Sequence, residues 1–192
     1  MPSLLCVTGN TDKFNTGRTW FNEFGVTLEQ VVTDIDEIQG EDPELIIRDK
    51  AAKAFEATGK PVVVTDDSWS IPGLNGFPGP YMKSMNHWFT VDDFLRLTKD
   101  LKDRSIILHQ FVAYQDEYEC VVFSKDIPGT MLTEARGESG PAIKQIMVFD
   151  IDYGKTMSEL EDSKTANDPV RLKKRGDSWE DLARWYSKKI AV

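Results

Sequence analysis

The sequence predicts a mixed α/β fold, in which a twisted sheet is flanked by helices. Segments with the patterns of strands and helices alternate in the first half of the chain, and longer strand-like segments follow one another in the second half. No internal repeat, low-complexity tract or flexible linker divides the 192 residues. We therefore expect a single domain over residues 1–192, with room for a sub-lobe. A cleft between two lobes is the natural place for a ligand in such a fold.

The first half predicts strands and helices in alternation. Residues 4–8 predict an apolar strand, residues 12–24 a helix and residues 27–32 a second strand. Asp42 and Pro43 are typical of the N-cap and the first position of a second helix, which Gly59 ends. Residues 62–64 are three valines and predict a short buried strand. The apolar residues of the second helix recur every three or four positions: Ile46, Ile47, Ala51, Ala54 and Phe55.

Antiparallel strands dominate the expected second half. Thr90 and Asp93 have the spacing of a capping box ahead of an apolar helical stripe. A last helix is expected from Ser178, with Asp181 completing another capping box. The predicted strands lie at residues 106–114, 118–123, 129–133 and 146–149, and the first two are joined by a hairpin turn at 115–117.

The composition excludes several classes of protein. A formal net charge of −9 argues against non-specific binding of nucleic acid. No apolar run approaches the roughly 18 residues that a membrane span needs, and the N-terminal segment lacks the regions of a secretion signal. Cys6 and Cys120 fall in predicted strands without metal-ligand spacing, which favours buried thiols in a reducing compartment. We expect a cytoplasmic protein without a membrane or nucleic-acid partner.

Residues 65–81, TDDSWSIPGLNGFPGPY, are the most informative segment. Asp66 and Asp67 stand at the expected end of a strand, where two carboxylates can hold a divalent cation and accept a proton. The glycines and prolines that follow favour a stiff loop over a helix. The segment indicates either a functional site or a surface turn with solvated aspartates.

Residues 8–13, TGNTDK, join the first strand to the first helix. Backbone N–H groups at the start of a helix suit a phosphate, Gly9 permits close approach of a ligand, and Lys13 adds a cation. The alternative is an ordinary strand–helix turn.

Three other segments carry possible chemistry. Glu41 either shares a cation with Asp67 or is simply solvated within an acidic stretch. Lys50, on the second helix, is either an anion ligand or a surface lysine. Residues 171–175, RLKKR, either hold an anionic ligand or solvate a loop. His87 and His109 suggest no metal site or triad, because no second histidine or thiol lies at ligand spacing, and His109 is expected to be a satisfied structural residue.

Together these segments resemble the inosine triphosphate pyrophosphatase family. The matching motifs agree in order and spacing: TGNxxK at 8–13, QGE at 39–41, IRDKA at 47–51, the aspartates at 66–67 and LNGFPGPY at 74–81. Members of this family cleave non-standard purine nucleoside triphosphates such as ITP, dITP and XTP to the monophosphate and pyrophosphate. The resemblance implies an α/β fold in two lobes with a central cleft. It also implies a homodimer, to which the segment around Trp88 and Phe89 contributes.

The resemblance also implies a role for individual residues. Glu41 and Asp67 would coordinate Mg²⁺ together with Asp66, and Asp67 would be the general base that activates water. Lys50 and Ser68 match positions that face the phosphates and the substrate. The triphosphate loop would consist of Thr8, Gly9, Asn10, Thr11, Asp12 and Lys13, with Lys13 as its cation.

The second half departs from the family pattern where the base is bound. A segment with an aromatic residue and an acid is replaced by residues 141–144, PAIK, so that Lys144 takes the place of the acid. The family's SHR triplet is absent, and its arginine matches either Arg175, through the sequence context, or Arg171, through an ungapped match. Lys164 is the nearest match to the lysine upstream of it. We expect cleavage to survive and the preference for hypoxanthine or xanthine to be weakened or redirected.

The leading prediction is therefore a Mg²⁺-dependent nucleoside triphosphate pyrophosphatase, with Lys144 and Arg175 among its substrate contacts. The same chemistry on another nucleobase is one alternative. A catalytically weak nucleotide-binding or regulatory protein is the other. Intact Lys13, Glu41 and Asp67 argue against the second alternative, because a protein that only binds nucleotides needs no metal ligand combined with a base.

Overall fold

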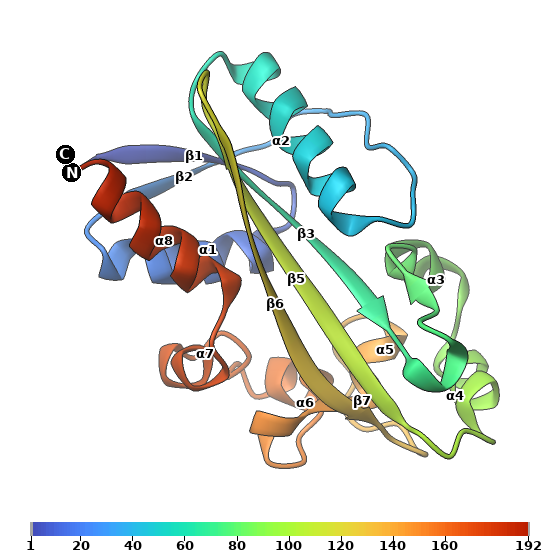
Figure 1. Ribbon diagram of the computed structural model, residues 1–192. Coiled ribbons are helices and arrows are strands. Elements are labelled where there is room, and N and C mark those ends of the chain that lie inside the picture. Colours follow the sequence, from blue (N-terminus) through green and yellow to red (C-terminus); the bar gives the residue numbers. More distant parts are fainter. Residues whose placement is uncertain (1, 192) are drawn as a thin grey trace. The chain divides into compact units, whose positions relative to one another are not determined.

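The computed structural model describes residues 2–191, and these fall into two compact units joined by shared strands (Figure 1). The first unit comprises Met1–Asp67, Gln110–Lys125 and Gly176–Val192, and the second comprises Ser68–His109 and Asp126–Arg175. Three strands contribute to both units: β3 (Val62–Ser70), β5 (Ser105–Gln115) and β6 (Cys120–Met131). The sheet has the order β2-β1-β3-β5-β6-β7, with β4 paired to β3, which confirms the predicted mixed α/β fold.

Parallel strands joined by helices build the first unit. β1 (Ser3–Val7) lies between β2 (Thr27–Val31) and β3 and runs parallel to both. α1 (Thr11–Glu23) and α2 (Pro43–Thr58) supply the crossover connections that parallel strands need. The predicted limits of α2 are confirmed, because Asp42 caps its N-terminus and Gly59 ends it in the left-handed conformation.

Helices cover both faces of the sheet in this unit. Ala113 of β5 belongs to an apolar cluster with Ile47 and Ala51 of α2. Gln110, on the opposite face of the same strand, accepts hydrogen bonds from the N–H and hydroxyl of Ser178 in α8 (Ser178–Lys189). Hence α2 packs on one face and α8 lies on the other.

The close packing of α8 on α1 requires a glycine. A Cβ atom on Gly17 would lie 2.7 Å from the ring of Trp179, which is fully buried. Phe21 meets the same ring edge-on, with 6.4 Å between the centroids. The N-cap of α8 is Asp177, which accepts the N–H of Trp179, so the predicted Ser178 cap was wrong. Ser178 is buried, and its polar groups are satisfied by the sheet instead.

Asp116 organises the turn between β5 and β6. Its carboxylate accepts hydrogen bonds of 2.9 Å from the N–H groups of Tyr118 and Glu119 and from the Tyr114 hydroxyl. The ammonium of Lys189, in α8, lies 3.1 Å from the same carboxylate. These bonds hold Tyr118 and Glu119 in the turn, and β6 therefore begins at Cys120 and not at residue 118.

Replacing Asp116 with asparagine is expected to lower the free energy of unfolding at pH 7 by about 2 kcal/mol. Burial raises the pKa of this carboxyl, but the N–H groups of Tyr118 and Glu119 and the Tyr114 hydroxyl outweigh it and hold the pKa at about 2. A lowered pKa stabilises the fold above the unfolded value of about 3.9, and this stabilisation is lost as the pH falls toward 2. Urea unfolding at several pH values measures it. A difference from the wild type that persists unchanged at pH 2 would contradict this explanation.

The second unit has a separate core. Ile106, Ile127 and Phe149 of the sheet pack there with Met85 and Phe94. Thr90 caps α4 in a capping box, as predicted. The elements of this unit are β4 (Pro78–Gly79), α3 (Met82–Trp88), α4 (Val91–Thr98), α5 (Ala142–Gln145), β7 (Met147–Phe149), α6 (Met157–Asp162) and α7 (Pro169–Arg175), with short 3-10 helices at Pro72–Leu74 and Asp150–Asp152.

Two strand predictions were wrong in extent. β3 does not end at residue 64, because Trp69 and Ser70 pair with β4 and keep the chain extended. The two aspartates therefore lie inside the strand and not at its end. Residues 129–133 are not a separate strand, since β6 continues through Pro128 to Met131. Pro128 lacks an N–H, and it lies just before the residues that pair with β7.

Candidate active site

Lys13 brings two of the predicted site segments together. Its Nζ lies 3.0 Å from Oδ2 of Asp67 and 3.9 Å from Oδ1 of Asp66. The three side chains are partly buried, with exposed fractions between 24% and 31%. All three belong to the first unit, where α1 carries the lysine and β3 the aspartates. The carboxylate pair and the cation of the predicted phosphate loop thus form one cluster.

The junction between β1 and α1 is fixed by local hydrogen bonds. The N–H of Thr8 donates to the carbonyl of Val31, and the Thr8 hydroxyl accepts the N–H of Asn10. Asn10 is the N-cap of α1 and accepts the N–H of Lys13 at 3.0 Å. A Cβ atom on Gly9 would meet nothing within 4 Å, so there is open space beside this backbone. The N–H groups of Thr8, Asn10 and Lys13 are thus used within the protein, and the open space at Gly9 lies beside the positive end of α1, a place that suits an anion such as a phosphate.

Both aspartates lie near the ammonium of Lys13, although they are neighbours in a strand. Consecutive strand residues point to opposite faces, but Oδ1 of Asp66 accepts the N–H of Asp67 at 2.9 Å and so bends back along the strand. Among residues 2–191, no group of three or more acidic, histidine or cysteine side chains is placed to hold a metal alone. Mg²⁺ commonly uses one or two protein carboxylates together with substrate phosphates. The pair fits a magnesium ion that binds with a nucleotide.

Glu41 and Lys50 do not belong to the cluster that Lys13 forms with the two aspartates. Glu41 is exposed in the loop before α2, and within the described chain it does not join the aspartates in a metal-binding group. Nζ of Lys50, on α2, lies 2.7 Å from the carboxylate of Glu37, and the lysine side chain is only 15% exposed. Both positions belong to the first unit.

The remaining predicted substrate contacts belong to the second unit. Ser68 follows the aspartates in β3 and is 4% exposed. Lys144 lies on α5 and forms an ion pair with Glu161 of α6. Arg175 is the last residue of α7.

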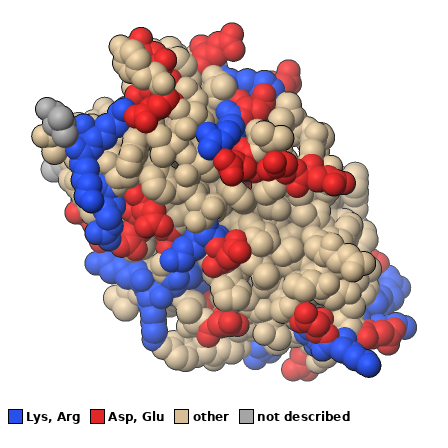
Figure 2. Space-filling model, in the orientation of Figure 1, with Lys and Arg blue, Asp and Glu red and all other residues tan. Residues whose placement is uncertain are grey.

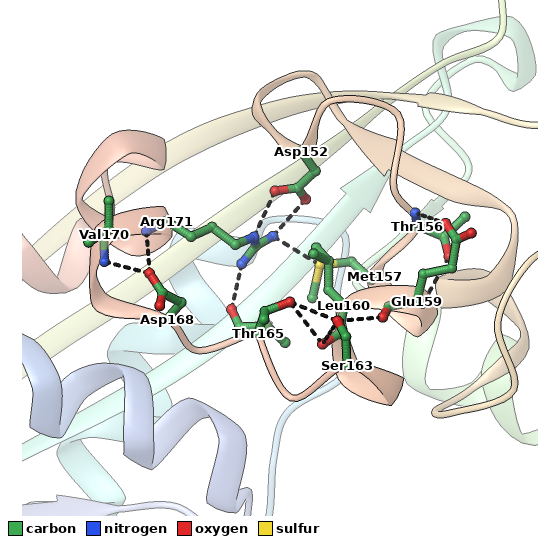
Figure 3. Close-up of polar contacts among 11 residues, drawn as sticks. Asp152, Thr156, Met157, Glu159, Leu160, Ser163, Thr165, Asp168, Val170 and Arg171 are labelled. Atoms are coloured by element: carbon green, nitrogen blue, oxygen red, sulfur yellow. Dashed lines mark hydrogen bonds and ion pairs between the residues drawn. The ribbon is translucent and has the colours of Figure 1, made fainter.

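The basic segment 171–175 is helical and not a loop, because it forms most of α7. Figure 3 shows the guanidinium of Arg171 directed at Asp152, to which Nε and Nη2 each donate at 2.7 Å. Its Nη1 donates to the carbonyl of Ala166 at 2.6 Å. Lys174 lies 4.5 Å from the ring centroid of Tyr153. Two of the four cations therefore fasten α7 to residues 152–153.

His109 is a satisfied residue, as predicted, but it has unexpected partners. Its Nε2 lies 2.7 Å from Oγ of Ser70, and its Nδ1 lies 2.6 Å from Oδ1 of Asp126. Sequence analysis missed this row of Ser70, His109 and Asp126 because the three residues lie on three strands, 39 and 17 residues apart. The order of the groups is that of a catalytic triad, in which the carboxylate is buried. Asp126 is 68% exposed, so we interpret the row as a polar contact across three strands.

Charged side chains of both signs are mixed on the surface shown in Figure 2, and the two cysteines do not form a disulfide. On the face shown in Figure 2, lysine and arginine side chains stand beside acidic ones. Ion pairs within α2 join Arg48 with Glu44 and Lys53 with Asp49. Both cysteines are free thiols. Burial raises the pKa of Cys6 to about 12, which makes it an inert thiol. Cys120 is only half-buried. None of the described helices has the length and apolar character of a membrane span.

The curled α/β sheet is shared with known proteins. A HAM1 protein from Coxiella burnetii superposes with a TM-score of 0.78 over 98% of this chain and 100% of its own, at 21% identity. A crystal structure described as a nucleoside-triphosphatase or dITP/XTP pyrophosphatase from Mycobacterium abscessus superposes with a TM-score of 0.66 over 90% of this chain and 94% of its own, at 20% identity. These likenesses establish the fold class.

Sequence comparison establishes the family. The model of the Ham1 family matches residues 4–185, and the chain belongs to this family. It is 28% identical to a dITP/XTP pyrophosphatase of Methanopyrus kandleri over 189 residues, which is 98% of each chain. It is 30% identical to a protein of the same name from Methanosarcina mazei over 187 residues, or 97% of this chain and 98% of the relative. The predicted family and its enzyme class are thereby confirmed.

Proposed function

We propose that the protein hydrolyses non-standard purine nucleoside triphosphates, of the ITP, dITP and XTP type, to the monophosphate and pyrophosphate. The observation that carries this proposal is the ion pair of Lys13 with Asp67 beside the β1–α1 junction. It places a carboxylate pair next to a backbone suited to phosphates. The names of the relatives support the substrate class, and the family match over residues 4–185 supports one functional domain over residues 1–192.

Asp67 acts as the general base in this proposal. Its carboxylate accepts a proton from the water that attacks the phosphorus, and the bond to the pyrophosphate group breaks. Lys13 and the loop of residues 8–13 bind the triphosphate, with Lys50 as a further cation. Asp66 and Asp67 are the proposed ligands of Mg²⁺, which when bound offsets the charge of the triphosphate and polarises the attacked phosphorus, and Glu41 remains the third ligand that the resemblance implies.

Base recognition is proposed to differ from that of the family. The place of the base-facing acid is taken by Lys144, and its ion pair with Glu161 places a second charge beside it. Arg175 is our candidate for the family's arginine, because Arg171 is committed to Asp152. Ser68 is proposed as a further substrate contact. We expect a smaller preference for hypoxanthine and xanthine over the standard bases than in the relatives.

Two properties of the whole protein belong to the same proposal. The segment around Trp88 and Phe89 would contribute to a homodimer, and Trp88 is 70% exposed. The proposed substrate class supports a cytoplasmic protein of nucleotide metabolism.

Pyrophosphate release over a panel of nucleotides tests the function. The panel contains ITP, dITP, XTP, the four standard triphosphates, dUTP and modified bases, each with Mg²⁺. Release of monophosphate and pyrophosphate from ITP, dITP or XTP is expected. A preference for dUTP or a modified base would instead support the same chemistry on another base. If no nucleotide is cleaved but nucleotides still raise the melting temperature, the protein is a binder and the proposal fails.

A further inference from the structure

Both lysines proposed to bind the triphosphate are paired with carboxylates in the free protein. Nζ of Lys13 lies 3.0 Å from Asp67, and Nζ of Lys50 lies 2.7 Å from Glu37. The lysine side chains are only 24% and 15% exposed, so neither ammonium is fully hydrated. A triphosphate that binds either lysine therefore competes with a carboxylate of the protein.

The Lys13 pair has a further consequence, because its partners are also the proposed metal ligands. The ammonium lies within 4 Å of both Asp66 and Asp67, where it balances two adjacent negative charges. A divalent cation would use the same carboxylate oxygens. Two positive ions held a few ångströms apart repel one another, most strongly where side chains are partly shielded from water. Lys13 and the metal therefore compete for the carboxylate pair.

We propose that Lys13 is an exchangeable counter-ion of the Asp66–Asp67 pair, so that divalent cation and nucleotide bind cooperatively. Without nucleotide, the ammonium occupies the carboxylates and weakens binding of the metal. With nucleotide, the phosphates attract the ammonium and supply oxygen ligands to the metal. By linkage, the factor by which nucleotide tightens metal binding equals the factor by which metal tightens nucleotide binding. The inference rests on the proposed function of this site.

The test measures the binding of Mn²⁺ without nucleotide, by calorimetry and by the electron paramagnetic resonance of free Mn²⁺. Lys13→Met removes the ammonium and keeps an unbranched side chain of nearly the same length. We expect this variant to bind Mn²⁺ about tenfold more tightly than the wild type in the absence of nucleotide. With a non-hydrolysable ITP analogue, tightening of Mn²⁺ binding by nucleotide is expected to be large in the wild type and about tenfold smaller in the variant.

Two control variants make the comparison specific. Lys60→Met causes the same change of net charge at an exposed turn residue of the same unit, and it is expected to match the wild type in Mn²⁺ affinity. Without nucleotide, Asp67→Asn is expected to abolish binding of Mn²⁺, both alone and combined with Lys13→Met. Circular dichroism and melting temperature verify folding, and Lys13→Gln replaces Lys13→Met if the methionine variant does not fold.

The outcomes separate this inference from the proposed function. Equal or weaker Mn²⁺ affinity in Lys13→Met than in Lys60→Met would overturn the exchange, even if pyrophosphate is released from ITP. Tighter binding in Lys13→Met supports it, even if no nucleotide in the panel is cleaved, because the titrations without nucleotide require no turnover.

Discussion

Replacing Asp67 with asparagine is expected to lower the rate of pyrophosphate release by about 10³-fold while the protein remains folded. Asparagine keeps the size of the side chain, but it can neither accept a proton from water nor provide a charged oxygen to a cation. Oδ2 of Asp67 is also the atom that Lys13 approaches to 3.0 Å, so the substitution removes the centre of the charged cluster. The measurement is kcat from pyrophosphate release at saturating nucleotide and Mg²⁺.

Asp66→Asn is the matched control, because it makes the same chemical change one residue earlier in β3. Its carboxylate lies 3.9 Å from the ammonium of Lys13, and it accepts the N–H of Asp67, a bond that asparagine can preserve. A loss of about tenfold is expected for a residue that assists the cation without acting as the base. Equal losses in the two variants would contradict a separate role of Asp67 as general base.

The meeting of Lys13 with the aspartates follows from features that the sequence contains. β1 pairs in parallel with β3, with Val7 opposite Val64. The chain that leaves β1 at Thr8 and the residues that follow Val64 therefore lie at the same end of the two strands. Parallel strands joined by helices always bring such positions together, and the alternating pattern of the first half predicts them.

The extent of β3 could not be predicted from local sequence. Its second part carries Asp66, Ser68 and Ser70 on one face, a polar pattern that on its own favours a turn. It stays extended because the short strand β4 pairs with Trp69 and Ser70. The pairing depends on the loop at residues 71–77, which is closed by the hydrogen bond from the N–H of Ile71 to the carbonyl of Phe77. Because the two aspartates lie within the strand and not at its end, Asp66 reaches Lys13 only by bending back along the backbone.

Side-chain pairs that join distant elements were also beyond local sequence patterns. Ser70, His109 and Asp126 lie on neighbouring strands, and no periodicity links them. The ion pair between Asp152 and Arg171 joins a 3-10 helix to a seven-residue helix. Elements this short show too few turns to reveal an apolar stripe, which also explains why α3, α5 and α6 were not predicted.

Replacing Arg171 with methionine is expected to lower the free energy of unfolding by about 3 kcal/mol or more. Asp152 is 1% exposed and Arg171 is 11% exposed, so the variant leaves a buried carboxylate without its two 2.7 Å partners (Figure 3). The double variant with Asp152→Leu removes both charges and is expected to recover most of the loss. Urea unfolding followed by fluorescence and circular dichroism measures the difference, and coincident transitions verify two-state behaviour.

Lys174→Met is the matched control for Arg171→Met, since it removes a cation from the same helix. Lys174 contacts the ring of Tyr153, which is 79% exposed, and a loss below about 1 kcal/mol is expected. Activity separates the two arginines. Arg171→Met is expected to lose activity only as folded protein is lost, whereas Arg175→Met is expected to raise KM for nucleotide in protein that remains folded. If Arg171→Met is as stable as the wild type and binds nucleotide poorly, then Arg171 and not Arg175 is the substrate arginine.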